Sequence, residues 1–212
     1  PYRVYGGQRF FERLEIKNAL AYMRLILNCH DDVAFERVVN IPTRGIGERT
    51  VDAVREHARN ISISMWSAAK AMIVDKNLNT RSANALAAFL NLINEMTNTL
   101  EALPLSELAE NSIEMSGLIE MHRREKGERG QSRVENLEEL VGACKNFTPE
   151  SIDTPVLAQF LDQVSLEAGE RQANEDQDAV QLMTLHSAKG LEFPLVIICL
   201  LYTSDAADDD TR

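Results

Sequence analysis

Helical periodicity runs through most of this 212-residue chain and is interrupted only towards its two ends. Apolar residues recur three and four positions apart, which is the spacing of an amphipathic helix that packs one face against a core. We expect helices over residues 11–27, 32–40, 80–100 and 132–147. The sequence therefore predicts a mainly α fold.

The strongest of these patterns covers residues 80–100 and follows a capping residue at Asn79 or Thr80. Its apolar stripe consists of Ala83, Leu86, Leu90, Ile93, Thr97 and Leu100. Such stripes form helix-bundle cores far more often than functional surfaces. We expect this stripe, together with Trp66 and Phe89, to be core.

The two ends of the chain have β-type patterns. Residues 2–5, 179–185 and 193–198 are short β-branched or apolar runs, each next to turn-forming or polar residues. A helical domain inserted into a sheet-containing α/β domain would give this order. We place the boundaries of the three parts at residues 1–28, 29–177 and 178–198.

Composition excludes several classes of protein. Hydrophobic residues make up 44% of the chain and charged residues 26%, as in a globular protein. The three cysteines are far apart without metal-ligand spacing, so we expect neither a zinc site nor a disulfide framework, and a reducing compartment. No apolar run approaches the roughly 20 residues of a membrane span, and we expect no membrane contact.

Charge is distributed unevenly. The formal net charge is -11, yet residues 1–60 carry +2 and residues 123–133 carry +3, whereas residues 134–212 carry -12. A phosphate-binding face needs local positive potential, so the two positive segments are the candidates for anionic partners. In the second we single out Arg129 and Arg133, against the alternative of an ordinary solvated loop.

The last fourteen residues depart from the pattern. Residues 199–212 end in an acidic, turn-like run and resemble the in-frame translation of a sequencing-library adapter. We expect the natural sequence to end near Ile198, with a genuine acidic tail as the alternative. Because the chain also begins with Pro instead of Met, we expect it to be a fragment.

The segment after the second β-type run is the richest in functional groups. It offers the hydroxyls of Thr184 and Ser187, the imidazole of His186, the ammonium of Lys189 and the carboxylate of Glu192. Hydroxyls and a cation suit phosphate oxygens, and a carboxylate can accept hydrogen bonds from a sugar. The alternative is an ordinary polar turn.

A second segment, Thr43-Arg44-Gly45-Ile46-Gly47-Glu48-Arg49-Thr50, leads directly into an amphipathic helix. Backbone N–H groups at the positive end of a helix suit a phosphate group, and the two arginines add charge. The alternative is a helix–helix turn that needs glycine for its dihedral angles.

Two stretches of the sequence resemble UvrD/Rep-type superfamily 1 DNA helicases. Residues 181–194, QLMTLHSAKGLEFP, resemble motif V of that family, and residues 5–24, YGGQRFFERLEIKNALAYMR, resemble its motif IVa region. The resemblance extends to about residue 198 and is greatest to the UvrD branch, with the Rep and PcrA branches as the alternative. It implies a helical 2B-type domain inserted into an incomplete RecA-like 2A domain.

The resemblance also implies roles for individual residues. Thr184, His186 and Ser187 would contact single-stranded DNA, while Lys189, Gly190 and Glu192 would couple this loop to ATP. The segment with Thr43, Arg44, Gly45, Ile46, Gly47, Arg49 and Thr50 would contact duplex DNA as a helix-hairpin-helix-like element. No residue is assigned as catalytic or as a metal ligand.

The implied function is that of an ATP-dependent 3′–5′ DNA helicase. Its cofactors would be ATP and Mg²⁺, its partners single-stranded and duplex DNA and proteins of excision and mismatch repair, and its location the bacterial cytoplasm at the nucleoid. No Gly is followed by Lys, so the chain has no P-loop, and we expect it to be inactive as an ATPase by itself. The alternative is a non-catalytic helical DNA-binding module.

Overall fold

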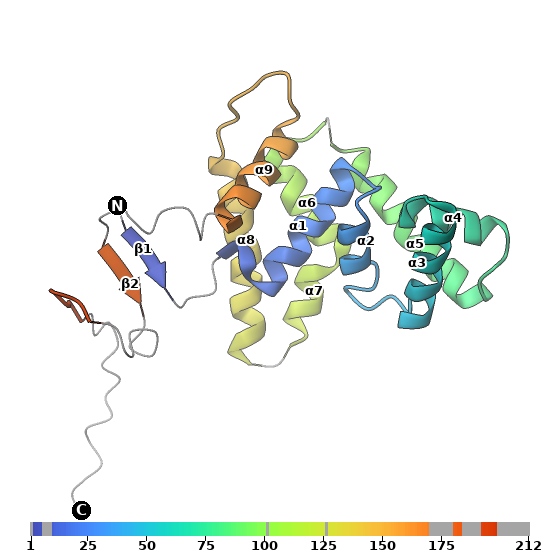
Figure 1. Ribbon diagram of the computed structural model, residues 1–212, viewed down its shortest axis with the longest axis horizontal. Coiled ribbons are helices and arrows are strands. Elements are labelled where there is room, and N and C mark those ends of the chain that lie inside the picture. The colour runs from blue at the N-terminus through green and yellow to red at the C-terminus, as the bar shows by residue number, and fades with distance from the viewer. Residues whose placement is uncertain are drawn as a thin grey trace, which may run out of the picture. The chain divides into compact units, whose positions relative to one another are not determined.

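The computed structural model describes residues 2–5, 10–100, 102–125, 127–169, 180–183 and 192–198, and its main elements are helices (Figure 1). The strands are β1 Tyr2–Tyr5 and β2 Val180–Met183. A 3₁₀ turn, η1, covers Phe10–Glu12. The helices are α1 Leu14–Leu27, α2 Asp32–Val38, α3 Glu48–Ile61, α4 Met65–Val74, α5 Thr80–Thr97, α6 Leu105–Ser116, α7 Leu118–Arg123, α8 Glu128–Asn146 and α9 Val156–Gly169. The prediction of a mainly α fold is confirmed.

The chain divides into two compact units. The first contains both ends of the chain, residues 1–7 and 176–212, and the second contains residues 8–175. In the first unit β1 and β2 pair in parallel, with Tyr2 opposite Val180 and Tyr5 opposite Met183. Segments almost 180 positions apart in sequence therefore form one sheet.

The helical unit is built around α1. This helix contacts α2, α5, α6, α8 and α9, and ten of its fourteen residues are buried (Figure 1). Burial on several sides explains why α1 belongs to the compact helical unit, which differs from the boundary after residue 28 that we expected. A helix surrounded by partners cannot be separated from them without exposing its apolar surface.

The core contains Trp66 and Phe89, as predicted. Trp66 and Phe89 are 2% and 0% exposed, and both rings meet Phe35 edge to face, at 6.5 and 5.5 Å between centroids. Asn79 caps α5, its side chain accepting a hydrogen bond from the Ser82 backbone N–H at 2.9 Å. The cap prediction is confirmed, and Leu86, Leu90 and Ile93 of the predicted stripe are buried. Ala83 and Leu100 are half-buried, and Thr97 is exposed, so the stripe is core only in its middle.

Two expected elements differ from the structure. Helix α8 begins at Glu128, four residues earlier than expected, because the small Gly130 lets its first turn pack closely against the end of α7. Residues 193–198 form no strand, and Leu195 and Ile197 are about four-fifths exposed. An apolar strand needs neighbours that pair with it and cover it, and in the described residues β1 and β2 pair only with each other.

Candidate nucleic-acid interface

The glycine loop, residues 43–50, follows α2 and includes the first residues of α3. Asn40 and the buried Ile46 hold it in place. The side-chain oxygen of Asn40 accepts hydrogen bonds from the backbone N–H groups of Arg44 and Ile46, at 2.8 and 3.2 Å. The Ile46 side chain is only 1% exposed. Gly45 has φ +80°, a conformation that other residues rarely adopt. The loop is therefore a fixed structure and presents its outer surface in a defined way.

Arg44 points into the protein. Its guanidinium donates hydrogen bonds to the carbonyl of Pro42 at 2.9 Å and to that of Ser116, the last residue of α6, at 2.8 Å. It also lies 5.7 and 5.6 Å from the ring centroids of Tyr22 and Phe89. A cation at a helix C-terminus is favoured by the helix dipole. These contacts show that Arg44 shapes the loop, and its expected contact with DNA stays a prediction.

Tyr22 completes this support from α1. Burial raises the pKa of Tyr22 to about 12, so its hydroxyl stays protonated at neutral pH. The hydroxyl donates a hydrogen bond to the Ile41 carbonyl, just before the loop, and lies 3.3 Å from the Val38 carbonyl oxygen. The backbone carbonyl groups of Ile41 and Pro42 on the buried side thus accept hydrogen bonds from the side chains of Tyr22 and Arg44.

Gly47 has a different role from Gly45. It is the N-cap residue of α3, with φ -75° and ψ 162°, a conformation open to any residue. A Cβ atom at this position would meet nothing within 4 Å. No side chain caps α3, so the first turn of this helix presents backbone N–H groups beside an exposed glycine. The fold itself does not require glycine here.

The outer surface of the loop carries charge from two helices. Thr43, Gly45, Gly47 and Arg49 are exposed, and Thr50, half-buried, bonds Ser82 of α5 through its hydroxyl at 3.2 Å. This contact brings the first turns of α3 and α5 together. Positive ends of two helices at one place favour an anion.

Arg81 is a basic residue that our sequence reasoning missed. It lies in the first turn of α5, is exposed, and its guanidinium is 4.0 Å from the position of a Cβ at Gly45. A cation at the positive end of a helix is disfavoured by the helix dipole. An arginine directly after the predicted cap of this helix was therefore the signal in the sequence that could have identified Arg81.

The basic segment of residues 123–133, which we call the α7–α8 turn, uses its charge differently. Arg133 pairs with the carboxylates of Glu125 at 2.6 Å and Glu15 at 3.7 Å, and is 17% exposed. His122, which is buried, lies with its Nδ1 2.7 Å from the same Glu125 oxygen. The hydrogen bonds with His122 and Arg133 lower the pKa of Glu125. Of the two proposed arginines, Arg129 alone is exposed.

The segment of residues 184–192 lies almost wholly outside the described residues. Thr184, His186, Ser187, Lys189 and Gly190 are among the residues that the structure does not describe, and Glu192 is exposed in an irregular stretch. Among the described residues there is no group of His, Cys, Asp or Glu side chains that could hold a metal ion. No helix of the described part is long and apolar enough to cross a membrane.

Comparison with known proteins finds a family and relatives that match almost the whole chain. Residues 1–204 match the family model of the UvrD-like helicase C-terminal domain. Over 200 residues the chain is 54% identical to DNA helicase II of Escherichia coli (strain K12), and over 203 residues it is 37% identical to the ATP-dependent DNA helicase PcrA of Bacillus subtilis (strain 168). Each alignment covers 93% of this chain, but only 28% and 27% of those relatives. Because the family match spans nearly the whole chain, the chain belongs to the UvrD-like helicase C-terminal domain family.

Proposed function

We propose that this chain is the part of an ATP-dependent 3′–5′ DNA helicase that holds duplex DNA, and that the glycine loop makes the contact. The observation that carries the proposal is Gly47: glycine is not needed there by the fold, yet it stands at the uncapped, exposed end of α3. Glycine is useful where another backbone must approach closely. A phosphate group of DNA could then accept hydrogen bonds from the first N–H groups of α3.

Such a contact is independent of base sequence. Backbone N–H groups and the side chains of Arg49 and Arg81 address phosphate oxygens, which are the same at every base pair. The exposed loop offers no side chain of the bidentate type that reads base edges, apart from its arginines. A helicase must grip any duplex that it meets, and this chemistry suits that task.

The remaining roles extend the proposal to residues 184–192. Thr184, His186 and Ser187 would contact single-stranded DNA, and Lys189, Gly190 and Glu192 would bind or sense ATP with Mg²⁺ in the intact enzyme. The parallel pairing of β1 with β2 supports an α/β motor domain of RecA-like type that is interrupted by a helical 2B-type domain. The higher identity to helicase II than to PcrA supports the helicase II branch. The resemblance to that branch implies a role in excision and mismatch repair at the bacterial nucleoid.

The central test compares two glycine variants of this chain. Fluorescence anisotropy with a labelled duplex bearing a single-stranded tail would measure affinity at several salt concentrations. Gly47→Ala should weaken binding about tenfold, the equivalent of one or two hydrogen bonds, with only a small fall in melting temperature, because alanine is a poorer N-cap residue than glycine. Gly45→Ala should lower the melting temperature, because alanine is strained at φ +80°.

The arginines supply a second readout of the same experiment. Replacing Arg49 or Arg81 by Gln should reduce the slope of log affinity against log salt by about one for each phosphate group that the variant no longer binds. Gly47→Ala should leave that slope nearly unchanged, since it removes no charge. Full affinity in Gly47→Ala, together with unchanged slopes in both arginine variants, would reject the glycine loop as the duplex contact.

A third measurement addresses the catalytic expectation. We propose that the chain by itself does not hydrolyse ATP, because it contains no P-loop lysine motif. DNA-stimulated phosphate release above that of a Lys189→Ala variant would contradict this. Reading the coding sequence upstream for such a motif distinguishes a helicase from a non-catalytic DNA-binding module.

A further inference from the structure

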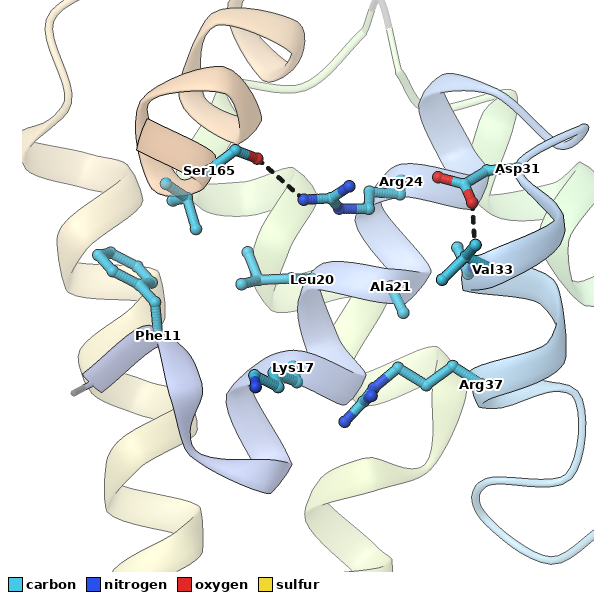
Figure 2. A pocket seen from close by; sticks show the side chains of 11 residues that line it. Phe11, Lys17, Leu20, Ala21, Arg24, Asp31, Val33, Arg37 and Ser165 are labelled. Atoms are coloured by element: carbon cyan, nitrogen blue, oxygen red, sulfur yellow. Dashed lines mark hydrogen bonds between the residues drawn. The ribbon is translucent and has the colours of Figure 1, made fainter. Parts of the chain in front are cut away.

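A groove of about 280 Å³ lies in the helical unit and includes none of the glycine-loop residues (Figure 2). Its floor is α1, through Leu20 and Ala21. One wall is α2, through Ala34, and the other is α9, through Val164. The floor and both walls are therefore aliphatic at their base.

Three cations surround this apolar floor. Lys17 and Arg24 are exposed and stand seven residues apart on α1, which places them about 10 Å apart along the helix axis. Arg37 stands on α2 and donates a hydrogen bond through Nε to Asn18 at 3.1 Å. Figure 2 shows the side chains of Lys17 and Arg37 on one side of the groove and Arg24 bonded to Ser165 at 3.0 Å on the other. Positive charge thus lies at both ends.

The groove has little negative charge to balance these cations. Asp31 is the one carboxylate among its lining residues, and that side chain accepts a hydrogen bond from the Ala34 backbone N–H at 2.9 Å as the cap of α2. At the edge, Val33 is 80% exposed. In a chain with a net charge of -11, three cations around an apolar strip are a local exception.

We propose that this groove binds an acidic amphipathic helix of a partner protein. Apolar side chains of that helix would pack against the exposed Val33 at the groove edge, and carboxylates about two turns apart would pair with Lys17 and Arg24. Single-stranded nucleic acid fits less well, because the aliphatic floor offers no platform for base stacking. The aromatic ring at the groove, Phe11, already packs against Phe10 and Phe160, at 5.1 and 6.5 Å.

The test uses this chain and three labelled probes. The first is a helical peptide of about five turns with two Glu residues seven positions apart and Leu residues between them. The second has Gln in place of both Glu residues, and the third is an oligo-dT strand. We expect the Glu peptide to bind at least fivefold more tightly than the Gln peptide, and its affinity to fall with added salt.

Charge reversal then locates the site. Lys17→Glu and Arg24→Glu should each weaken binding of the Glu peptide about fivefold or more, whereas Lys145→Glu, an exposed position on α8, should change it less than twofold. A peptide with Lys in place of both Glu residues should bind the Lys17→Glu/Arg24→Glu double variant better than the unaltered chain. This rescue shows that the variant is folded and that the pairing is direct.

Three results would overturn the proposal. Equal affinity for the Glu and Gln peptides would remove the charge complementarity. Binding of oligo-dT with loss in the same two variants, without peptide binding, would assign the groove to nucleic acid. If the charge reversals on α1 and on α8 weaken peptide binding equally, the peptide is attracted by the overall charge of the protein and not by the groove. None of these results depends on whether the glycine loop binds duplex DNA.

Discussion

The glycine loop and the α7–α8 turn look alike in sequence, since each combines glycines with arginines, but they use these residues in opposite ways. In the loop, Arg44 is turned inward while Gly47 leaves helix N–H groups open to the outside. In the turn, Gly130 is buried and Arg133 is held by two carboxylates. The number of basic residues in a segment therefore does not measure the charge that it presents. Backbone N–H groups of the loop supply an attraction that no count of charges includes.

The largest effect that we predict concerns the close packing of the turn. In Gly130→Ala the new Cβ would lie 2.5 Å from the His122 carbonyl oxygen and 2.8 Å from that of Glu125, both backbone atoms. We expect a loss of about 3 kcal/mol in the free energy of unfolding, measured by urea denaturation. Gly142→Ala on the same helix, where a Cβ meets nothing within 4 Å, is the matched control and should stabilise slightly. Equal stabilities of the two variants would show that the turn is not closely packed.

The next effect separates the two arginines of the loop. Arg44→Met removes donors from the carbonyls of Pro42 and Ser116 and should cost about 2 kcal/mol of stability. Arg49→Met, at an exposed position, should leave the melting temperature unchanged and weaken duplex binding. Thermal denaturation and anisotropy on both variants check this. A stable Arg44→Met protein that has lost DNA affinity would make Arg44 a direct contact.

A smaller effect separates the two arginines of the turn. Arg133→Gln leaves the carboxylates of Glu125 and Glu15 without their cation and should cost about 1 kcal/mol. Arg129→Gln should not change stability, and any loss of DNA affinity in it measures what the turn adds to binding. If Arg133→Gln instead reduces DNA affinity and leaves the free energy of unfolding unchanged, the ion pairs with Glu125 and Glu15 do not stabilise the fold.

The smallest effect is a pH dependence in the same turn. The Glu125 pKa is lowered in the folded state, so its contribution to stability is present above the ordinary carboxyl value of 4.5 and is lost as the pH falls through the lowered value. The free energy of unfolding should therefore fall more steeply below pH 4.5 in the unaltered chain than in Glu125→Gln. Parallel curves would mean that Glu125 is not stabilised in the folded state.

Periodicity predicted α1, α2, α5 and α8, because a buried stripe such as Leu86, Leu90 and Ile93 follows from the helical repeat alone. It did not place α4, α6, α7 or α9. Thr97, from the same stripe, is exposed at the last residue of the helix, which a repeat cannot foresee. The inward direction of Arg44 depends on the C-terminus of α6, more than seventy positions away in sequence. Contacts of that kind are set by tertiary packing. The glycine loop could therefore be found from the sequence, but which of its side chains lie on the outer surface could not be predicted.

Chemical-shift mapping of backbone amides, with the same tailed duplex as the titrant, tests the central claim most directly. We predict that the largest shifts occur at the amides of Gly47, Glu48 and Arg49, at the open end of α3, with smaller ones around Arg81. The amides of Gly130 and Arg133 should move little. Large shifts confined to the α7–α8 turn, with the glycine loop unmoved, would contradict the account.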